Sequence, residues 1–216
     1  SLFPALTVVL HFGGQTLQEV LSTHTVQVQA FDPYRFRQID MAGQRVPLAG
    51  NFSSGYGLWL ARSGFSTQAL RNVLGKSGSL DAPYVYLTQP FDPGRHVIVM
   101  LHGLASSPEA WINVANDIMG DEALRQRYQV WLFTYNTGNP VFYSGGLLAQ
   151  GLRNIVHQLD PDGRDPALRR MVIIGHSQGG LLTRLTAVDS GTVFWDSLFA
   201  VPPEGLRISP ESRAAL

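Results

Sequence analysis

The sequence predicts an α/β fold with a mainly parallel sheet flanked by helices, and three apolar segments carry this prediction. Residues 96–101 (HVIVML), 130–135 (VWLFTY) and 171–175 (MVIIG) are continuous apolar runs, as expected of strands covered on both faces. Patterns with helical spacing lie between these runs and behind the last one. Such an alternation of strands and helices is typical of sheets whose parallel strands are joined by helical crossovers.

Three helices are predicted around these strands. The first starts at Ser107-Pro108, a cap followed by a first-turn proline, and stops at Gly120. The second covers residues 145–159, and the third directly follows the strand at 171–175. The apolar positions that define the three helical faces are Trp111, Val114, Ala115 and Ile118; Leu148, Leu152, Ile155 and Leu159; and Leu181, Leu182, Leu185 and Val188.

Residues 1–80 predict a β-rich N-terminal extension with one helix. The segment 6–12 (LTVVLHF) favours a strand, and residues 23–31 alternate apolar side chains with Gln27 and Gln29, which indicates a strand with one wet face. Turns are expected at Asp32-Pro33 and Ala42-Gly43.

A helix is expected next, over residues 56–74, and it is closed by Gly75. The Ser- and Gly-rich segment 76–83 predicts a loop. Beyond it, residues 81–216 form the second predicted part, which begins with a short strand (PYVYLTQPF).

Composition narrows the possible functions. The chain has 216 residues, of which 44% are apolar and 15% charged, and its formal net charge is zero, so nucleic acid is not an expected partner. The absence of cysteine excludes disulfides, thiolate catalysis and cysteine zinc sites. The apolar run 2–10 is interrupted by Pro4 and is far shorter than the roughly 20 residues that span a bilayer, so no transmembrane segment is expected in this chain.

The motif GHSQGG at residues 175–180 predicts a nucleophile elbow. It lies where a buried strand ends and an amphipathic helix begins, so that Ser177 would occupy a strained turn with its hydroxyl above the sheet. Gly175 and Gly179 would allow the strand and the helix to approach closely. Serine is a weak nucleophile without a base, and the motif therefore requires a histidine elsewhere.

The motif LHGL at residues 101–104 predicts the other half of an oxyanion site. Such a site uses the amide of the residue after the nucleophile, here Gln178, and an amide from the loop after an earlier strand. Leu104 is the expected second donor, and His102-Gly103 would shape the loop that carries it.

Three stretches, LHGLASSPEAW, FTYNTGNP and VIIGHSQGGLLTRL, together resemble the α/β-hydrolase superfamily, within it the bacterial lipase and esterase group. The resemblance covers roughly residues 83–190. It implies an α/β-hydrolase fold, Ser177 as nucleophile, and Leu104 and Gln178 as oxyanion donors. It also implies hydrolysis of carboxylic esters, often lipids, without a cofactor or metal. A bacterial cell-envelope or secreted location is favoured over the cytoplasm.

The sequence departs from this family at the catalytic base. In this fold the acid and then the histidine follow the serine along the chain. No histidine follows Ser177; the six are His11, His24, His96, His102, His157 and His176. Acids do follow it: Asp189, Asp196, Glu204 and Glu211. We therefore expect a sheet that is incomplete at its C-terminal side, with base and acid supplied by polypeptide beyond residue 216, either a C-terminal segment or a second chain.

Three functions fit these observations. The first is a serine ester hydrolase acting on an acyl or lipid ester. The second is a non-catalytic module of the same fold that binds an acyl ligand or a protein, and the third is an acyltransferase that uses the same serine. His102 is expected to shape its loop rather than to act as base, and DPDGRD at residues 160–165 predicts a turn rather than a calcium loop.

Overall fold

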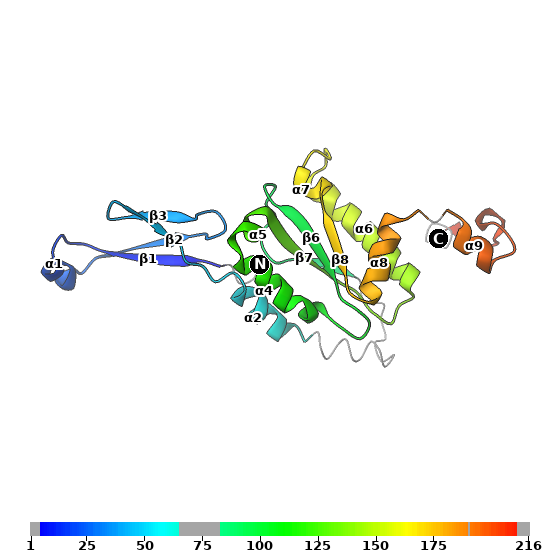
Figure 1. Cartoon of the computed structure of the whole chain (residues 1–216), viewed down its shortest axis with the longest axis horizontal. Helices are drawn as coiled ribbons and strands as arrows, with labels where there is room; N and C mark the ends of the chain where they lie inside the picture. Colours follow the sequence, from blue (N-terminus) through cyan, green and yellow to red (C-terminus); the bar gives the residue numbers. More distant parts are fainter. Residues whose placement is uncertain (1–4, 65–82, 190, 211–216) are drawn as a thin grey trace.

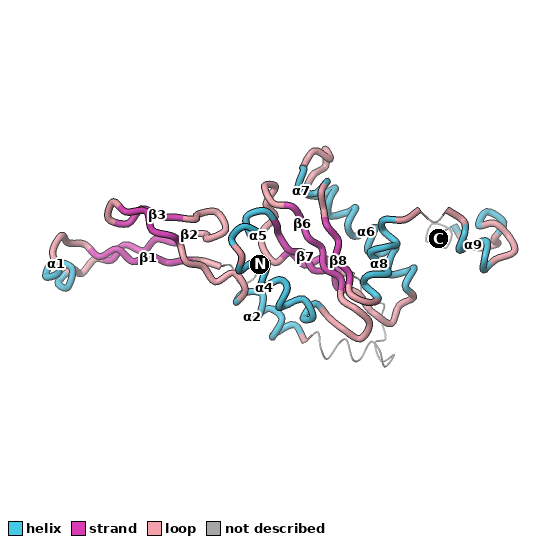
Figure 2. The backbone as a smooth tube through the Cα atoms, viewed as in Figure 1, coloured by secondary structure: helices cyan, strands magenta, loops and turns pink. Residues whose placement is uncertain are grey.

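The protein is described by a computed structural model that covers residues 5–64, 83–189 and 191–210. The described part of the chain contains one mixed sheet of four strands, in the order β5-β7-β6-β8, and two separate antiparallel hairpins. In the sheet, β6 (His96–Leu101) lies parallel to both β7 (Tyr128–Thr134) and β8 (Val172–Gly175), while β5 (Tyr84–Leu87) is antiparallel to β7. The expected α/β fold is confirmed, as Figures 1 and 2 show.

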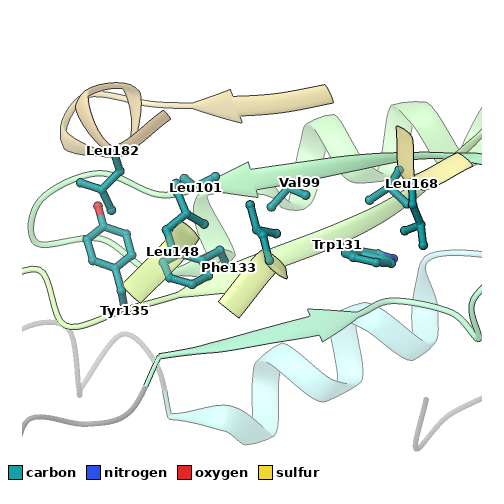
Figure 3. Close-up of a cluster of buried hydrophobic side chains, with 10 residues drawn as sticks. Val99, Leu101, Trp131, Phe133, Tyr135, Leu148, Leu168 and Leu182 are labelled. Carbon is teal, nitrogen blue, oxygen red and sulfur yellow. The ribbon is translucent and has the colours of Figure 1, made fainter. Parts of the chain in front are cut away.

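Both faces of this sheet are covered, which explains why its central strands are apolar without interruption. Val97, Val99 and Leu101 of β6 point to one face, where Leu148 and Leu182 from two helices meet them. The close-up in Figure 3 shows this cluster, and four of these five side chains are labelled there. On the other face Ile98 and Met100 pack with residues of different helices. Leucine and valine side chains that are fully buried in this way stabilise the fold by about 1.5–3 kcal/mol each.

The helices of the sheet follow the predicted order, and two short ones were not predicted. After β6 come the 3₁₀ turn η1 (Pro108–Trp111) and α4 (Ile112–Gly120), and after β7 comes α6 (Val141–Leu159). α8 (Gln178–Ala187) follows β8. The short helices α5 (Glu122–Arg127) and α7 (Pro166–Arg169) begin at the aspartate caps Asp121 and Asp165.

The N-terminal residues form two hairpins that contain no buried residue in their strands. β1 (Thr7–Phe12) pairs with β2 (Val26–Phe31), and β3 (Gln38–Met41) pairs with β4 (Gln44–Pro47). The turn at Ala42-Gly43 is confirmed, since both residues have positive φ, 52° and 78°. Figure 1 shows the first hairpin extending away from the four-stranded sheet.

One expectation about this region was wrong. The strand predicted within residues 23–31 exists, but its apolar side is not covered, since Val26 and Val28 are 43% and 64% exposed. The alternation therefore reflects strand geometry and not burial in the described structure. Helix α1 (Leu17–Ser22) between β1 and β2 was also missed, although the sequence carries its signal: Thr16 and Glu19 form a capping box.

The predicted helix at 56–74 is shorter than expected where it can be checked. α2 spans Ser54–Ser63 and ends at Gly64, whose φ of 67° is left-handed and closes the helix. Residues 65–82, which include Gly75 and most of the expected loop at 76–83, lie outside the described residues. Tyr56 and Leu60 of α2 are buried against the sheet face that carries Ile98 and Met100.

The C-terminal residues add helices and no strand in the described part. Helix α9 covers Val193–Leu198, and the 3₁₀ turn η2 covers Pro203–Gly205. Strand β8 consequently forms one edge of the described sheet, with β6 as its only partner there. The sheet is incomplete on this side, as the sequence predicts.

Candidate functional site

Ser177 sits in a strained turn between β8 and α8. Its φ of 53° and ψ of −120° lie in a region that side chains other than glycine rarely occupy, and its side chain is exposed. The amides of Gly179 and Gly180 donate to the carbonyls of His176 and Ser177, both at 2.9 Å, and so close the first turn of α8. The strain is therefore held in place by the hydrogen bonds of the turn.

Two glycines make this turn possible. A Cβ at Gly175 would lie 2.2 Å from the carbonyl oxygen of Gly179, and one at Gly179 would lie 2.5 Å from the carbonyl oxygen of Leu101. Both distances are to backbone atoms, which cannot move aside without disrupting the sheet. Any larger residue at either position would therefore separate the strand, the helix or the loop after β6.

The loop after β6 lies directly against this turn. The amide of His176 donates to the carbonyl of Leu101 at 3.0 Å, which continues the pairing of β6 with β8. A Cβ at Gly103 would lie 3.0 Å from the Cβ of Ser177. The structure thus brings together Gly103 and Ser177, two of the residues singled out from the sequence, and glycine at 103 is what permits the approach.

The two amides expected to form the oxyanion site belong to Gln178 and Leu104, which lie in different segments of the chain. Gln178 is the first residue of α8, where backbone N–H groups lack helical partners and the helix dipole is positive. Leu104 lies one residue after Gly103, and its side chain is 60% exposed. Neither amide donates a hydrogen bond to another residue of the part of the chain that the structure describes. Both are available to an external acceptor.

His102 is buried beneath the loop and is not placed to act as a base. Its side chain is 1% exposed, and burial lowers the pKa of His102 to about 4, so the imidazole is neutral at pH 7. Nδ1 lies 3.1 Å from the carbonyl oxygen of Gly103, and the ring stacks on Tyr135 with centroids 4.6 Å apart. These contacts hold the imidazole within the loop, and the role of His102 in shaping the oxyanion site stays a prediction.

A third segment, the loop of residues 135–139 after β7, joins the other two. The hydroxyl of Tyr135 donates to the carbonyl of His102 at 2.8 Å and lies 3.5 Å from Oε1 of Gln178. The hydroxyl of Thr137 accepts from the amide of Ala105, and its carbonyl accepts from Nε2 of Gln178, both at 3.3 Å. We call residues 135–139 the clamp loop, because it contacts both segments that carry the two amides.

The clamp loop was not recognised as part of the site from the sequence. Its residues lie within FTYNTGNP, which contributes to the family resemblance, but nothing in those letters shows which atoms they meet. In the structure Tyr135, Asn136, Thr137 and Asn139 are all buried, at 4%, 7%, 3% and 9% exposure. So many buried polar residues in a loop are a structural signal that the sequence pattern does not carry.

The acids and histidines leave the base unassigned. Asp189 accepts from the amide of Gly191, and Asp196 accepts from the hydroxyl of Thr192, so each carboxylate binds a residue close to it in the sequence. Glu211 lies outside the described residues. His176 is exposed next to Ser177. No hydrogen bond joins the Ser177 hydroxyl to an imidazole within residues 5–64, 83–189 and 191–210.

The described residues contain no group of three or more histidine, aspartate or glutamate side chains that could hold a metal ion. The segment 160–165 forms a turn in which Gly163 has a φ of 66° and the amide of Asp165 donates to Asp160. None of the described helices has the length and apolar character needed to cross a bilayer.

Comparison with known proteins places this geometry in a family. A model of the alpha/beta hydrolase family matches residues 98–216, more than half of the chain, and this range includes the loop after β6, the clamp loop and the elbow. The chain therefore belongs to the alpha/beta hydrolase family. No curated protein and no solved structure gave a match.

Proposed function

We propose that the chain is the nucleophile-bearing part of a serine hydrolase that cleaves carboxylic esters through an acyl-enzyme intermediate. The observation that carries the proposal is the strained backbone of Ser177, which lies against Gly103. The residues that follow these two in the chain, Gln178 and Leu104, have amides that donate to no described residue. Backbone strain of this kind persists only where the surrounding structure enforces it.

The reaction follows from these positions. The Ser177 oxygen attacks the acyl carbonyl and passes its proton to a base, and the negative charge that forms on the carbonyl oxygen rests on the amides of Leu104 and Gln178. The alcohol leaves with a proton from the same base. Water then attacks the acyl-enzyme, which releases the acid and restores the serine. Removing one oxyanion donor typically costs about 2.7–4 kcal/mol of transition-state stabilisation.

Base and acid come from polypeptide beyond residue 216 in this proposal, either a C-terminal segment or a second chain. The open edge of the sheet supports it: Val172 and Ile174 of β8 are 44% and 36% exposed, and so is Leu181 of α8, at 56%. Apolar side chains on an unpaired strand favour association with further polypeptide. The buried, neutral His102 does not supply the missing base.

The proposed substrate class is supported by the composition of the loops near Ser177. Leu104, which follows Gly103, is exposed and apolar, and Phe142, in the helix that follows the clamp loop, is 59% exposed. No charged side chain contributes to the loop after β6 between Leu101 and Ser107 or to the clamp loop. This environment suits an apolar acyl group, and therefore an acyl or lipid ester.

The test is covalent labelling of the native polypeptide that contains this chain with a fluorophosphonate. We expect a single adduct at Ser177 by intact mass and peptide mapping, ester hydrolysis in the same preparation, and loss of at least about 10³-fold in hydrolysis for Ser177→Ala. Ser54→Ala, at the exposed start of α2, is the control and should label normally.

Failure to label Ser177 in a folded preparation would favour the non-catalytic module of the same fold. An acyl ligand that binds equally well to wild type and Ser177→Ala would point the same way. Transfer of the acyl group to added alcohols in preference to water would favour an acyltransferase instead.

A further inference from the structure

A cavity of about 700 Å³ lies at the opposite end of the sheet from Ser177. Residues 33–38, 47–48 and 52 of the N-terminal part line one side, and the other side is lined by Asp92, Gly94, Arg95, Glu122, Arg125 and Gln126. The second group precedes β6 and β7, so it marks the N-terminal ends of the parallel strands, whereas Ser177 follows the C-terminal end of β8. The cavity is therefore separate from the proposed ester site.

The lining is rich in arginine. Among the described residues it includes four guanidinium groups and two carboxylates, and these are Arg35, Arg37, Arg95, Arg125, Asp92 and Glu122. Asp92 is paired with Arg95 at 3.1 Å, and Asp32, just outside the lining, lies 3.7 Å from Arg35. Arg37 and Arg125 make no ion pair with a described residue. Glu122 makes no ion pair either and accepts from the side-chain amide of Gln126 at 2.7 Å. With Asp32 counted, four guanidinium groups face three carboxylates, which leaves an excess of one positive charge.

Arg95 adds an unusual feature to the cavity wall. It is 7% exposed, Nε faces Asp92, and Nη2 donates to the carbonyl of Tyr34. Nη1 is buried without a hydrogen-bond partner among the described residues. A buried, charged donor without an acceptor is unfavourable and rare, and it marks a place where an acceptor is needed.

Aromatic rings hold the arginines in place. The guanidinium of Arg125 lies 3.9 Å from the centroid of the Phe52 ring, and that of Arg95 lies 5.4 Å from the centroid of Tyr34. The two rings meet edge to face at 5.1 Å. Guanidinium groups that are ordered before a ligand arrives lose less conformational entropy when they bind it.

We propose that this cavity binds a phosphate-bearing molecule, with Arg37 and Arg125 as the main contacts and Arg95 as a fixed positive charge behind them. Guanidinium groups match the oxygens of phosphate bidentately, and Arg37 and Arg125 form no ion pair with a described carboxylate that would compete for them. The volume far exceeds that of a single ion, since a water molecule takes up about 30 Å³. The ligand is therefore a phosphate group on a larger molecule, either a free organic phosphate or a lipid headgroup.

The bound group would join two parts of the chain. Arg37 belongs to the N-terminal part and Arg125 to α5 of the hydrolase part, so one phosphate between them bridges both. Binding would therefore stabilise the fold, because a ligand that binds only the folded state raises its apparent stability.

The experiment is calorimetric titration of the native polypeptide with glycerol 3-phosphate, with inorganic phosphate, and with glycerol as the uncharged control. We expect both phosphates to bind, glycerol not to bind, and Arg37→Gln to weaken binding about tenfold or more. Arg153→Gln, an equal change of charge at an exposed position of α6, should leave the affinity unchanged. The Arg37 side chain is exposed and makes no ion pair with a described residue, and the substitution keeps the backbone carbonyl that accepts from the amide of Leu48, so it should not disturb folding.

Vesicle sedimentation separates the two sources of the phosphate. Binding to phosphatidylcholine vesicles that contain phosphatidic acid, lost in Arg37→Gln, would identify a lipid headgroup; binding of the free phosphates alone would identify a soluble ligand. Equal affinity of Arg37→Gln and wild type would overturn the proposal. So would the absence of phosphate binding, including the case in which polyglutamate binds in its place, which would indicate an acidic peptide.

Discussion

The four-stranded sheet and the first N-terminal hairpin are both made of apolar strands, yet only one of them is buried. Leu101 on β6 and Leu132 on β7 are 0% exposed, whereas Leu10 on β1 is 51% exposed. The sheet gains from packing on two faces, while β1 and β2 depend on six paired positions and a capped helix between them. Strand pairing alone gives marginal stability, so the contrast shows how much of this fold depends on helices that cover the sheet.

The largest loss of stability is expected for a substitution at the elbow, where strand β8 and helix α8 pack most closely. Gly175→Ala places a methyl group 2.2 Å from the Gly179 carbonyl oxygen, and we expect a loss of more than about 4 kcal/mol, enough to leave little folded protein. Gly151→Ala, in the interior of α6 with nothing within 4 Å of the new Cβ, should instead stabilise by about 0.5–1 kcal/mol. Urea unfolding followed by circular dichroism compares the two. A folded Gly175→Ala protein of normal stability would contradict the close approach of strand and helix.

Truncating a leucine in each region sharpens the comparison directly. Leu132→Ala removes a fully buried side chain from β7 and should lower the free energy of unfolding by about 2–5 kcal/mol. Leu10→Ala on β1 should change it by no more than about 0.5 kcal/mol, because that side chain is half exposed. Similar losses for the two variants would mean that the hairpin face is covered in solution.

The pH dependence of stability tests the buried loop after β6. Burial lowers the pKa of His102 to about 4 from its ordinary 6.5, so on acidification the unfolded chain takes up this proton before the folded one. The free energy of unfolding should therefore fall between about pH 6.5 and about pH 4, by up to about 3 kcal/mol from this group, and level off below. Urea titrations across this range measure how the free energy of unfolding depends on pH. His102→Asn should remove the part of this dependence that comes from His102. An unchanged slope in the variant would show that His102 titrates normally.

The smallest effect belongs to the clamp loop. Tyr135→Phe removes the hydroxyl that donates to the His102 carbonyl, which should cost about 1 kcal/mol of stability and slow the labelling of Ser177 about tenfold, because the loop carrying the Leu104 amide is held less firmly. The measurements are the rate of fluorophosphonate labelling and the separate changes in kcat and in KM for ester hydrolysis. Tyr143→Phe, at a 44% exposed position of α6, is the matched control. Equal labelling rates for both variants would leave Tyr135 with a purely structural role.

Much of the site could be predicted from the sequence because its signals are local. Gly175 and Gly179 are required by close approaches to backbone atoms, and they appear as the glycines two residues before and two residues after Ser177. Gly103 appears in the separate motif LHGL. The continuous apolar strands and the helix behind the elbow are likewise visible in the periodicity. The roles of Ser177, Leu104 and Gln178 in catalysis remain predictions until labelling tests them.

The rest depended on contacts between distant residues. The contacts of the clamp loop and the arginine cavity are formed by residues that lie far apart in the sequence. The face of the first hairpin is exposed because no other described segment packs against it. Arg37 precedes β3 and Arg125 lies in α5, so strands β5 and β6 of the sheet separate them along the chain, yet both line one cavity.

The sequence alone determined the parallel sheet, the position of the elbow and the absence of a histidine after Ser177, since these follow from apolar periodicity, glycine placement and order along the chain. Only the tertiary structure decided that His102 is buried and neutral, that Tyr135 and Thr137 tie the two amide-bearing segments together, and that the alternating strand β2 leaves its apolar side uncovered. The physical reason is that burial and hydrogen-bond partners are properties of what surrounds a residue, and the surroundings are contributed by other segments of the chain.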